Sequence, residues 1–319
     1  MAVYTEVSFD EAAQLFSELD LGQLQSLKAC AGGIENTNYF ADSDAGQYVL
    51  TLFERLTHEQ LPFYLHLMKH LAGHGVPVPD PAPDKSGAIL HSLKGKPAAV
   101  VNKLRGASHL QPSLVHCASV GGMLARMHLC SQHFDLQQPN LRGLTWWNDT
   151  LPAVLPHVTQ EQRSLLLGEL AYQNHVHESS AYKALPVGTI HADLFRDNVM
   201  FEGDELTGFF DFYFAGCDTF LFDIGVCLND WCIDLTTGQH DAARADAFLT
   251  AYQAVRPLAA QERDLLPAMA RAGALRFWIS RLWDFYLPRE ASVLKAHDPT
   301  HFERVLRQRA MHPKELCPQ

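Results

Sequence analysis

Residues 188–201 read GTIHADLFRDNVMF, and residues 208–212 read GFFDF. The first stretch places Asp193 and Asn198 on a loop between two apolar strands, and the second adds Asp211 at the end of a hairpin. Phosphoryl transfer needs such a set of carboxylate and amide side chains. One carboxylate accepts the proton of an attacking hydroxyl, while an Asn and a second carboxylate hold the magnesium that neutralises the phosphates of ATP. The spacing Asp-x4-Asn alone occurs by chance about once in a chain of this length, so the prediction also depends on the flanking strands and on Asp211.

The composition is that of an ordinary globular protein. The 319 residues are 47% hydrophobic and 19% charged, enough for two lobes with separate cores. A formal net charge of -11 argues against nucleic acid or an anionic membrane surface as the main partner. The most apolar stretch, residues 209–228, is broken by three aspartates and predicts no membrane span, and residues 1–16 contain no secretory signal. The 7 cysteines include no C-x-x-C pair, which favours a reducing cytoplasm.

The order of the predicted elements indicates an α+β chain. Ser8 and Glu11 form a capping box at the start of a short helix, and apolar pieces around 27–30, 37–41 and 47–53 are typical of antiparallel strands. A helix over 59–74 and a second hairpin, near Ile89 and over 98–104, complete the first part. Beyond it the pattern predicts helices over 112–130 and 159–177, then others from about residues 222, 241, 261 and 299. We place the domains at 1–104, a nucleotide-binding lobe, and 105–319, a catalytic and substrate-binding lobe.

Several motifs resemble those of one known superfamily. HADLFRDN (191–198) with Asp211 resembles the catalytic loop and metal-binding Asp of the aminoglycoside phosphotransferase/choline kinase group. GGIENTNYF (32–40) is similar to the hairpin that covers the phosphates in that group, and GMLARMH (122–128) is similar to one of its helices. The resemblance extends over most of the chain. It implies a protein-kinase-like bilobal fold, with a small N-terminal lobe of antiparallel sheet plus helix and a larger, mostly helical C-terminal lobe.

A narrower resemblance concerns the acceptor. ENTNYF (35–40), LNDWC (228–232) and RFWISR (276–281) are similar to sequences of the homoserine kinases built on this fold. This implies ATP and Mg²⁺ as cofactors and phosphate transfer to the hydroxyl of L-homoserine, giving O-phospho-L-homoserine on the way to threonine. Choline, methylthioribose, hydroxylysine and aminoglycosides stay open as other acceptors. A non-catalytic nucleotide-binding regulator is the alternative from another class.

The catalytic roles follow from the chemistry of the loop. We predict Asp193 as the base that orients the substrate hydroxyl, against the alternative that it only caps a turn. Asn198 and Asp211 would be oxygen ligands of magnesium, because a charge in the apolar strand before Asp211 is costly unless it is paired or metal-bound. His191 and His128 are interpreted as structural residues. A further aspartate, Asp223, is expected to anchor the backbone of the loop.

The predicted nucleotide contacts come from the first lobe. Gly32 and Gly33 allow backbone N–H groups to approach phosphate without an intervening Cβ. Asn36 and Thr37 could add amide and hydroxyl contacts, and the backbone of 101–103, beginning at Val101, would contact adenine.

One position departs from the kinase pattern. Thr51 stands where most kinase-like sequences have a lysine that bridges the α- and β-phosphates, and a threonine cannot supply that charge. Arg55, Lys69 or Arg196 could reach the phosphates instead, or magnesium and backbone dipoles could suffice. Glu59, the candidate for the acid that normally pairs with this lysine, then loses its partner. This departure is the main argument for the regulator.

A zwitterionic amino alcohol needs a cation for its carboxylate and an acid for its ammonium group. Asp230, Trp231, Arg276 and Arg281 offer these residue types, and Asn38 could add an amide contact. Arg276 and Arg281 are five residues apart on a helix, so we do not expect both in one pocket. The charged residues could instead form ion pairs that join helices. Three tryptophans also keep an aromatic cage for choline open: Trp231, Trp278 and Trp283.

Overall fold

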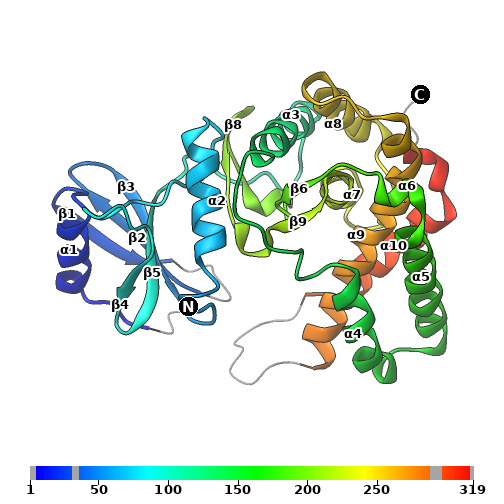
Figure 1. Cartoon of the computed structure of the whole chain (residues 1–319), viewed down its shortest axis with the longest axis horizontal. Coiled ribbons are helices and arrows are strands. Elements are labelled where there is room, and N and C mark those ends of the chain that lie inside the picture. Colours follow the sequence, from blue (N-terminus) through cyan, green and yellow to red (C-terminus); the bar gives the residue numbers. More distant parts are fainter. Residues whose placement is uncertain (1–4, 31–35, 288–296, 317–319) are drawn as a thin grey trace. The chain divides into compact units, whose positions relative to one another are not determined.

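The structure is a computed structural model that describes residues 5–30, 36–287 and 297–316. The described chain divides into two compact units (Figure 1). The first unit contains the described residues up to Arg105 together with Gly208–Phe210, and the second contains Gly106–Thr207 and the described residues from Asp211 onward.

The first unit is a five-stranded sheet with two helices. Its strand order is β1-β2-β3-β5-β4, and neighbouring strands pair antiparallel. The capping box predicted at Ser8 and Glu11 is present at the start of the first helix. The elements are α1 (Phe9–Glu18), β1 (Leu24–Ala29), β2 (Asn36–Ser43), β3 (Gln47–Phe53), α2 (Pro62–Gly73), β4 (His91–Leu93) and β5 (Lys96–Asn102).

Helix α1 covers one face of this sheet. Leu15 and Phe16 of α1 pack in one buried cluster with Leu50 and Leu52 of β3. Because successive side chains of a strand point to opposite faces, Thr51 between these two leucines faces away from α1. The sheet therefore has one face covered by α1 and a second face that contains Thr51.

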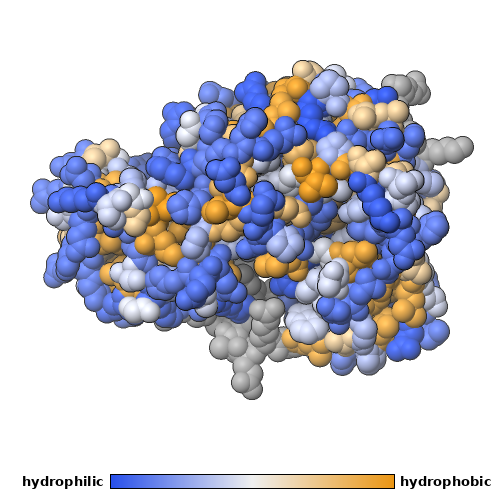
Figure 2. Space-filling model, in the orientation of Figure 1, coloured by the Kyte–Doolittle hydropathy of each residue, from blue (hydrophilic) through white to orange (hydrophobic). Residues whose placement is uncertain are grey.

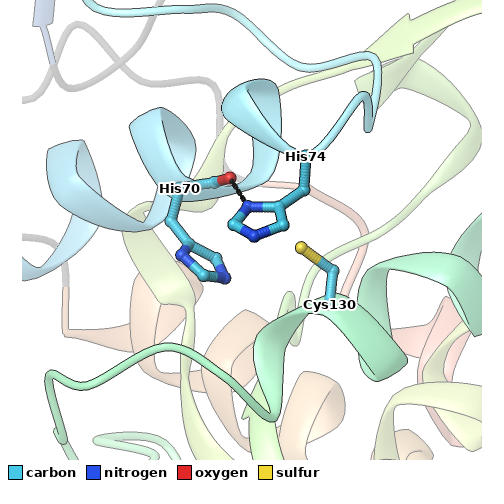
Figure 3. Close-up of side chains that lie close together, drawn as sticks. All are labelled: His70, His74 and Cys130. Atoms are coloured by element: carbon cyan, nitrogen blue, oxygen red, sulfur yellow. Dashed lines mark hydrogen bonds between the residues drawn. The ribbon is translucent and has the colours of Figure 1, made fainter.

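Helix α2 begins later than predicted and ends in a local hydrogen bond. It starts at Pro62, a residue suited to the first helical position, so Glu59 lies in the preceding turn. At its other end the ring of His74 donates from Nδ1 to the carbonyl oxygen of His70 at 2.7 Å (Figure 3). Gly75 then adopts a φ of 78°, which stops the helix.

The second unit is mostly helical and contains two short pairs of strands, β6 with β9 and β7 with β8. The end of β8, from Gly208, belongs to the first unit. The elements are α3 (Leu114–Ser131), α4 (Leu144–Val154), α5 (Gln160–Glu178), α6 (Ser180–Lys183), β6 (Val187–Ile190), β7 (Val199–Glu202), β8 (Glu205–Phe209), β9 (Gly216–Thr219), α7 (Phe220–Trp231), α8 (Ala242–Val255), α9 (Ala260–Tyr286) and α10 (Thr300–Met311).

Glycines allow two helix pairs of this unit to pack closely. A Cβ added at Gly121 of α3 would lie 2.2 Å from the carbonyl oxygen of Phe248 in α8. A Cβ added at Gly225 of α7 would lie 2.7 Å from the carbonyl oxygen of Met269 in α9. Every residue of α7 is buried, so this helix forms the centre of the unit and fixes what is attached to it.

Within the described residues, no helix is long and apolar enough to cross a membrane. In Figure 2, hydrophilic residues cover much of the visible face, with apolar residues interspersed among them.

Candidate active site

The loop that follows β6 is anchored by Asp223 of α7. Its carboxylate accepts the backbone N–H of His191 at 2.9 Å and that of Ala192 at 2.8 Å. Ala192 has a φ of 64°, a conformation that a residue with a Cβ rarely adopts. The backbone N–H of Asp193 donates to Nδ1 of His191 at 3.3 Å. The predicted structural roles of Asp223 and His191 are confirmed by these bonds.

The anchor is itself held by a buried histidine. Nε2 of His128 lies 3.1 Å from a carboxylate oxygen of Asp223, and its Nδ1 lies 2.7 Å from the hydroxyl of Tyr252. Burial lowers the pKa of His128. Burial alone would raise the pKa of Asp223, but its hydrogen bonds with His128 and with the backbone of His191 lower it. His128 is thus a satisfied core residue, as predicted.

Asp193 and Asn198 lie on opposite ends of this loop. The side-chain amide of Asn198 donates to the backbone carbonyl oxygen of Asp193 at 2.8 Å. Its Oδ1 points away from that bond and keeps its capacity to accept or to bind a cation. Asp211 follows β8 with a φ of 69°, at the start of a short 3-10 turn over Phe212–Phe214.

The carboxylates of this region influence one another. Burial raises the pKa of Asp193 to about 8; the cation of Arg276 opposes the rise, and the charges of Asp211 and Asp197 add to it. A divalent cation would relieve this repulsion between carboxylates. The oxygen donors of Asn198 and Asp211 are the ligands that magnesium prefers, so these residues fit the predicted metal.

Arg196 and Asp230 are hydrogen-bonded to each other. This corrects the predictions of Arg196 as a phosphate ligand and of Asp230 as a substrate contact. Both the backbone N–H and Nε of Arg196 donate to Oδ2 of Asp230, at 2.8 Å and 3.1 Å. The two terminal nitrogens donate to the carbonyl oxygens of Leu110 and Asp230. The guanidinium of Arg196 is therefore used within the fold and does not serve as a phosphate ligand. For the same reason Asp230 is not open to the ammonium group of a substrate; its ion pair joins α7 to the loop that contains Arg196.

Trp231 is a core residue, which corrects its prediction as a substrate contact. It is fully buried, and its Nε1 donates to the carbonyl oxygen of Leu194 at 2.9 Å. Trp278 is fully buried as well. An aromatic cage for choline requires accessible ring faces, and these two rings do not offer them.

Apart from Arg196, the predicted nucleotide residues belong to the first unit. Gly32 and Gly33 lie outside the described residues. The hydroxyl of Thr51 donates to Oδ1 of Asn38 at 2.7 Å, across the pairing of β3 with β2. Val101 of β5 pairs with Val49, which shares the face of Thr51. Asn36 lies at the start of β2, on the face of Asn38.

Thr37 faces the other side of the sheet, which corrects its prediction as a phosphate contact through the hydroxyl. Its side chain is fully buried, and its hydroxyl donates to Glu54 at 2.7 Å. Glu54 also forms an ion pair with Lys96, which the pattern of the sequence did not predict. Continuing the β3–β5 register by two residues places these two side chains opposite each other. Lys69, considered as a phosphate ligand, forms an ion pair with Asp80 at 2.9 Å.

Arg276 and Arg281 extend from α9. Arg276 is only 3% exposed, and its guanidinium lies 4.9 Å from the ring centre of Phe214 and 3.7 Å from that of Phe277. Both arginines oppose the rise in the pKa of Asp193, and Arg276 has the larger effect. The sequence did not indicate the role of Phe214, because nothing in its neighbourhood marks it as the partner of an arginine 62 residues later.

Comparison with known families identifies the class. Residues 26–258 match the phosphotransferase enzyme family, so the chain belongs to that family. A homoserine kinase of Polaromonas naphthalenivorans (strain CJ2) is 73% identical to this chain over 98% of its length and 99% of the relative's. A homoserine kinase of Burkholderia multivorans is 56% identical over 99% of this chain and 98% of the relative.

Solved structures share the fold at low sequence identity. A spectinomycin phosphotransferase in complex with ADP and spectinomycin has a TM-score of 0.70 at 11% identity, covering 98% of this chain and 100% of that one. The amicoumacin kinase hAmiN in complex with AMP-PNP has a TM-score of 0.68 at 16% identity, covering 97% and 93%. The predicted fold, an N-terminal antiparallel sheet with helices followed by a mostly helical part in a kinase-like arrangement, is confirmed.

Proposed function

We propose that this protein is an ATP- and magnesium-dependent kinase that phosphorylates the hydroxyl of L-homoserine. The observation that carries the proposal is the anchored loop. Asp223 fixes two consecutive backbone N–H groups just before Asp193, and Asn198 closes the same loop. The homoserine kinases that are 73% and 56% identical over nearly the whole chain support this acceptor.

Asp193 has the role of orienting the acceptor. Its carboxylate accepts the hydroxyl proton as the hydroxyl oxygen attacks the γ-phosphorus of ATP. A phosphorus–oxygen bond forms to the acceptor, the bond from the γ-phosphorus to the bridging oxygen breaks, and ADP leaves. The hydrogen bonds that Asp223 and Asn198 make with the backbone of the loop support this role, because a base must be positioned before its proton affinity matters.

Asn198 and Asp211 would hold magnesium. The ion neutralises charge on the phosphates when it is bound. The charges of Asp211 and Asp197 both raise the pKa of Asp193, and a bound cation would offset part of that effect, which supports a metal site here.

The nucleotide would contact the sheet face of Asn38, Thr51 and Val101, together with the backbone of Gly32 and Gly33. Asn36 lies on the same face, and Thr37 would contribute through its backbone. Backbone N–H groups and magnesium would take the place of the missing lysine at Thr51.

A panel of acceptors tests the proposal. L-Homoserine, choline, methylthioribose, hydroxylysine and spectinomycin would each be assayed for ADP release with ATP and Mg²⁺. We expect clear turnover with L-homoserine and formation of its O-phosphate. Turnover on another alcohol but not on homoserine would overturn the acceptor. ATP binding without turnover on any of them would favour the non-catalytic regulator.

A further inference from the structure

Arg276 combines deep burial with missing hydrogen bonds. The side chain is 3% exposed, and neither Nε nor Nη2 has a hydrogen-bond partner among the described residues. Buried N–H groups of a cation that lack acceptors are costly, by several kcal/mol in order of magnitude, because they lose their water without a replacement. Folding alone gives no reason to keep such a residue.

The other buried arginines of the described chain satisfy their guanidinium groups. Arg196 bonds to Asp230 and to two carbonyl oxygens. Arg256 bonds to Glu262 at 2.8 Å, and Arg309 bonds to Asn229 and to a carbonyl oxygen, both at 2.9 Å. Arg276 differs from them, so its missing partners are a local feature of this site and not a general habit of the fold.

Aromatic rings and charges hold Arg276 in place as a cation. The rings of Phe214 and Phe277 flank the guanidinium and contribute cation–π attraction. Burial lowers its pKa to about 9, and the nearby charge of Asp193 favours the charged form. Arg142 and Arg281 also lie near enough to oppose that charge. Asp284 favours the charged form as Asp193 does, and a bound anion would offset the repulsion that Arg142 and Arg281 exert on Arg276.

The geometry points to Arg276 as the receptor for the α-carboxylate of the acceptor. We infer that this arginine makes the site selective for hydroxy amino acids over amino alcohols that lack a carboxylate. The inference rests on the proposed function. Nε and Nη2 form one edge of the guanidinium fork, which matches the two oxygens of a carboxylate. Homoserine has three carbons between its hydroxyl and its carboxylate, so one small molecule could contact both Asp193 and Arg276.

The test combines a variant with a truncated acceptor. L-Homoserine and 3-aminopropan-1-ol, which is homoserine without its carboxylate, would be compared in the wild type and in Arg276→Met. We expect kcat/KM of the wild type to favour homoserine by about 10- to 150-fold, since a charged hydrogen-bonded pair contributes about 1.5–3 kcal/mol. Arg276→Met should lose about that factor on homoserine, and change kcat/KM for 3-aminopropan-1-ol and KM for ATP by less than about threefold.

Two further variants separate binding from folding. Arg276→Lys retains the charge but not the fork, and should recover part of the lost selectivity. Arg263→Met, on the same helix and away from the described site, should leave the selectivity unchanged. Thermal unfolding without substrate adds an independent readout: removing an unpaired buried charge should leave the Tm of Arg276→Met equal or higher, whereas a structural arginine would lower it.

The outcomes distinguish the two proposals. A wild type that phosphorylates homoserine and 3-aminopropan-1-ol equally well, or an Arg276→Met variant that keeps the wild-type selectivity, would overturn the role of Arg276 alone. An equal loss on both acceptors together with a lower Tm would also overturn it, and would assign Arg276 to the fold. No turnover of homoserine by the wild type would remove the proposed function and this inference with it. If Arg276→Met does not fold, the acceptor selectivities of Arg276→Lys and of the wild type decide whether Arg276 binds the carboxylate.

Discussion

Asp223 positions the proposed base, Asp193, by binding the backbone of the loop and not the side chain of Asp193. Ala192 carries a φ of 64°, which costs about 1 kcal/mol or more for a residue with a Cβ. The two N–H groups that Asp223 accepts, each worth more than a neutral hydrogen bond because the acceptor is charged, offset that strain. The conformation that presents Asp193 is therefore maintained by a residue 30 positions later in the chain.

Replacing Asp193 by Ala should abolish most of the transfer. We expect kcat to fall by about 10²–10⁴-fold, because a positioned base contributes about that much, while ATP affinity stays within about twofold. Steady-state ADP release and calorimetric titration with ATP measure the two quantities. Asp197→Ala is the matched control, since Asp197 is an exposed carboxylate of the same loop. A variant of Asp193 that keeps most of its activity would show that the base is assigned wrongly.

His240 should make stability depend on pH. Burial and the neighbouring Arg309 lower the pKa of His240 to about 4, and Nη1 of Arg309 lies 3.0 Å from its Nδ1. The unfolded chain, with a histidine pKa of about 6.5, binds a proton that the folded chain refuses. This group thus contributes stability above about pH 6.5 that is lost as the pH falls towards 4.

The variant His240→Asn keeps an acceptor for Arg309 but does not titrate. Urea unfolding at intervals between about pH 4 and pH 7 should show a smaller loss of free energy at low pH for the variant than for the wild type. Identical pH profiles would mean that the protonated histidine is accommodated in the folded state.

At the residue level, candidate site residues can be grouped from the sequence where their spacing is local. Asp193, Asn198 and Asp211 stand within one loop and hairpin, so their common chemistry is visible in the order of the residues. Arg196 and Asp230 could not be paired in this way, because they meet only when α7 packs behind the loop. Asn36 and Thr37 were both predicted as side-chain contacts of the nucleotide, but as neighbours in β2 they point to opposite faces of the sheet.

Two neighbouring glycines of α3 have different surroundings, so replacing each by alanine should change the stability in opposite directions. Gly121 contacts the backbone of α8, whereas a Cβ at Gly122 would meet only the carbonyl oxygen of Ala251, at 3.8 Å. Gly121→Ala should lower the free energy of unfolding by about 1–3 kcal/mol through overpacking. Gly122→Ala should raise it by up to about 1 kcal/mol, because alanine favours a helix. Urea unfolding of the two variants measures both, and equal effects would contradict the close approach of α3 to α8.

Most element boundaries could be predicted because their signals are local. The helices expected from about residues 222, 241, 261 and 299 begin at 220, 242, 260 and 300. Capping side chains of Thr219 and Asp241 mark two of these starts. Helix α4 was missed, since it follows Gly143 without a side-chain cap and contains Pro152. Its residues are held in a helix by burial of Trp147 and Leu151, a tertiary effect that the local pattern does not contain.

At the scale of the whole molecule, the sequence predicted a sheet-containing part and a helical part, but not the order of the strands. β5 lies between β3 and β4, and this arrangement brings Lys96 to Glu54. Long-range pairing of this kind is set by side-chain packing across the sheet, which a single sequence does not reveal. Each unit has buried residues of its own, which raises the question of whether their cores unfold together.

The tryptophans allow that question to be answered. All 5 lie between residues 146 and 283, in the second unit, so tryptophan fluorescence follows that unit while circular dichroism follows both. Leu50 in the first unit and Leu275 in the second are both fully buried, and Leu→Ala at either should cost about 2–5 kcal/mol. Because each unit has its own core, we expect Leu275→Ala to lower the urea midpoint of fluorescence. Leu50→Ala should shift only part of the dichroism signal. If Leu50→Ala lowers the fluorescence midpoint as much as Leu275→Ala does, the two cores form one cooperative unit.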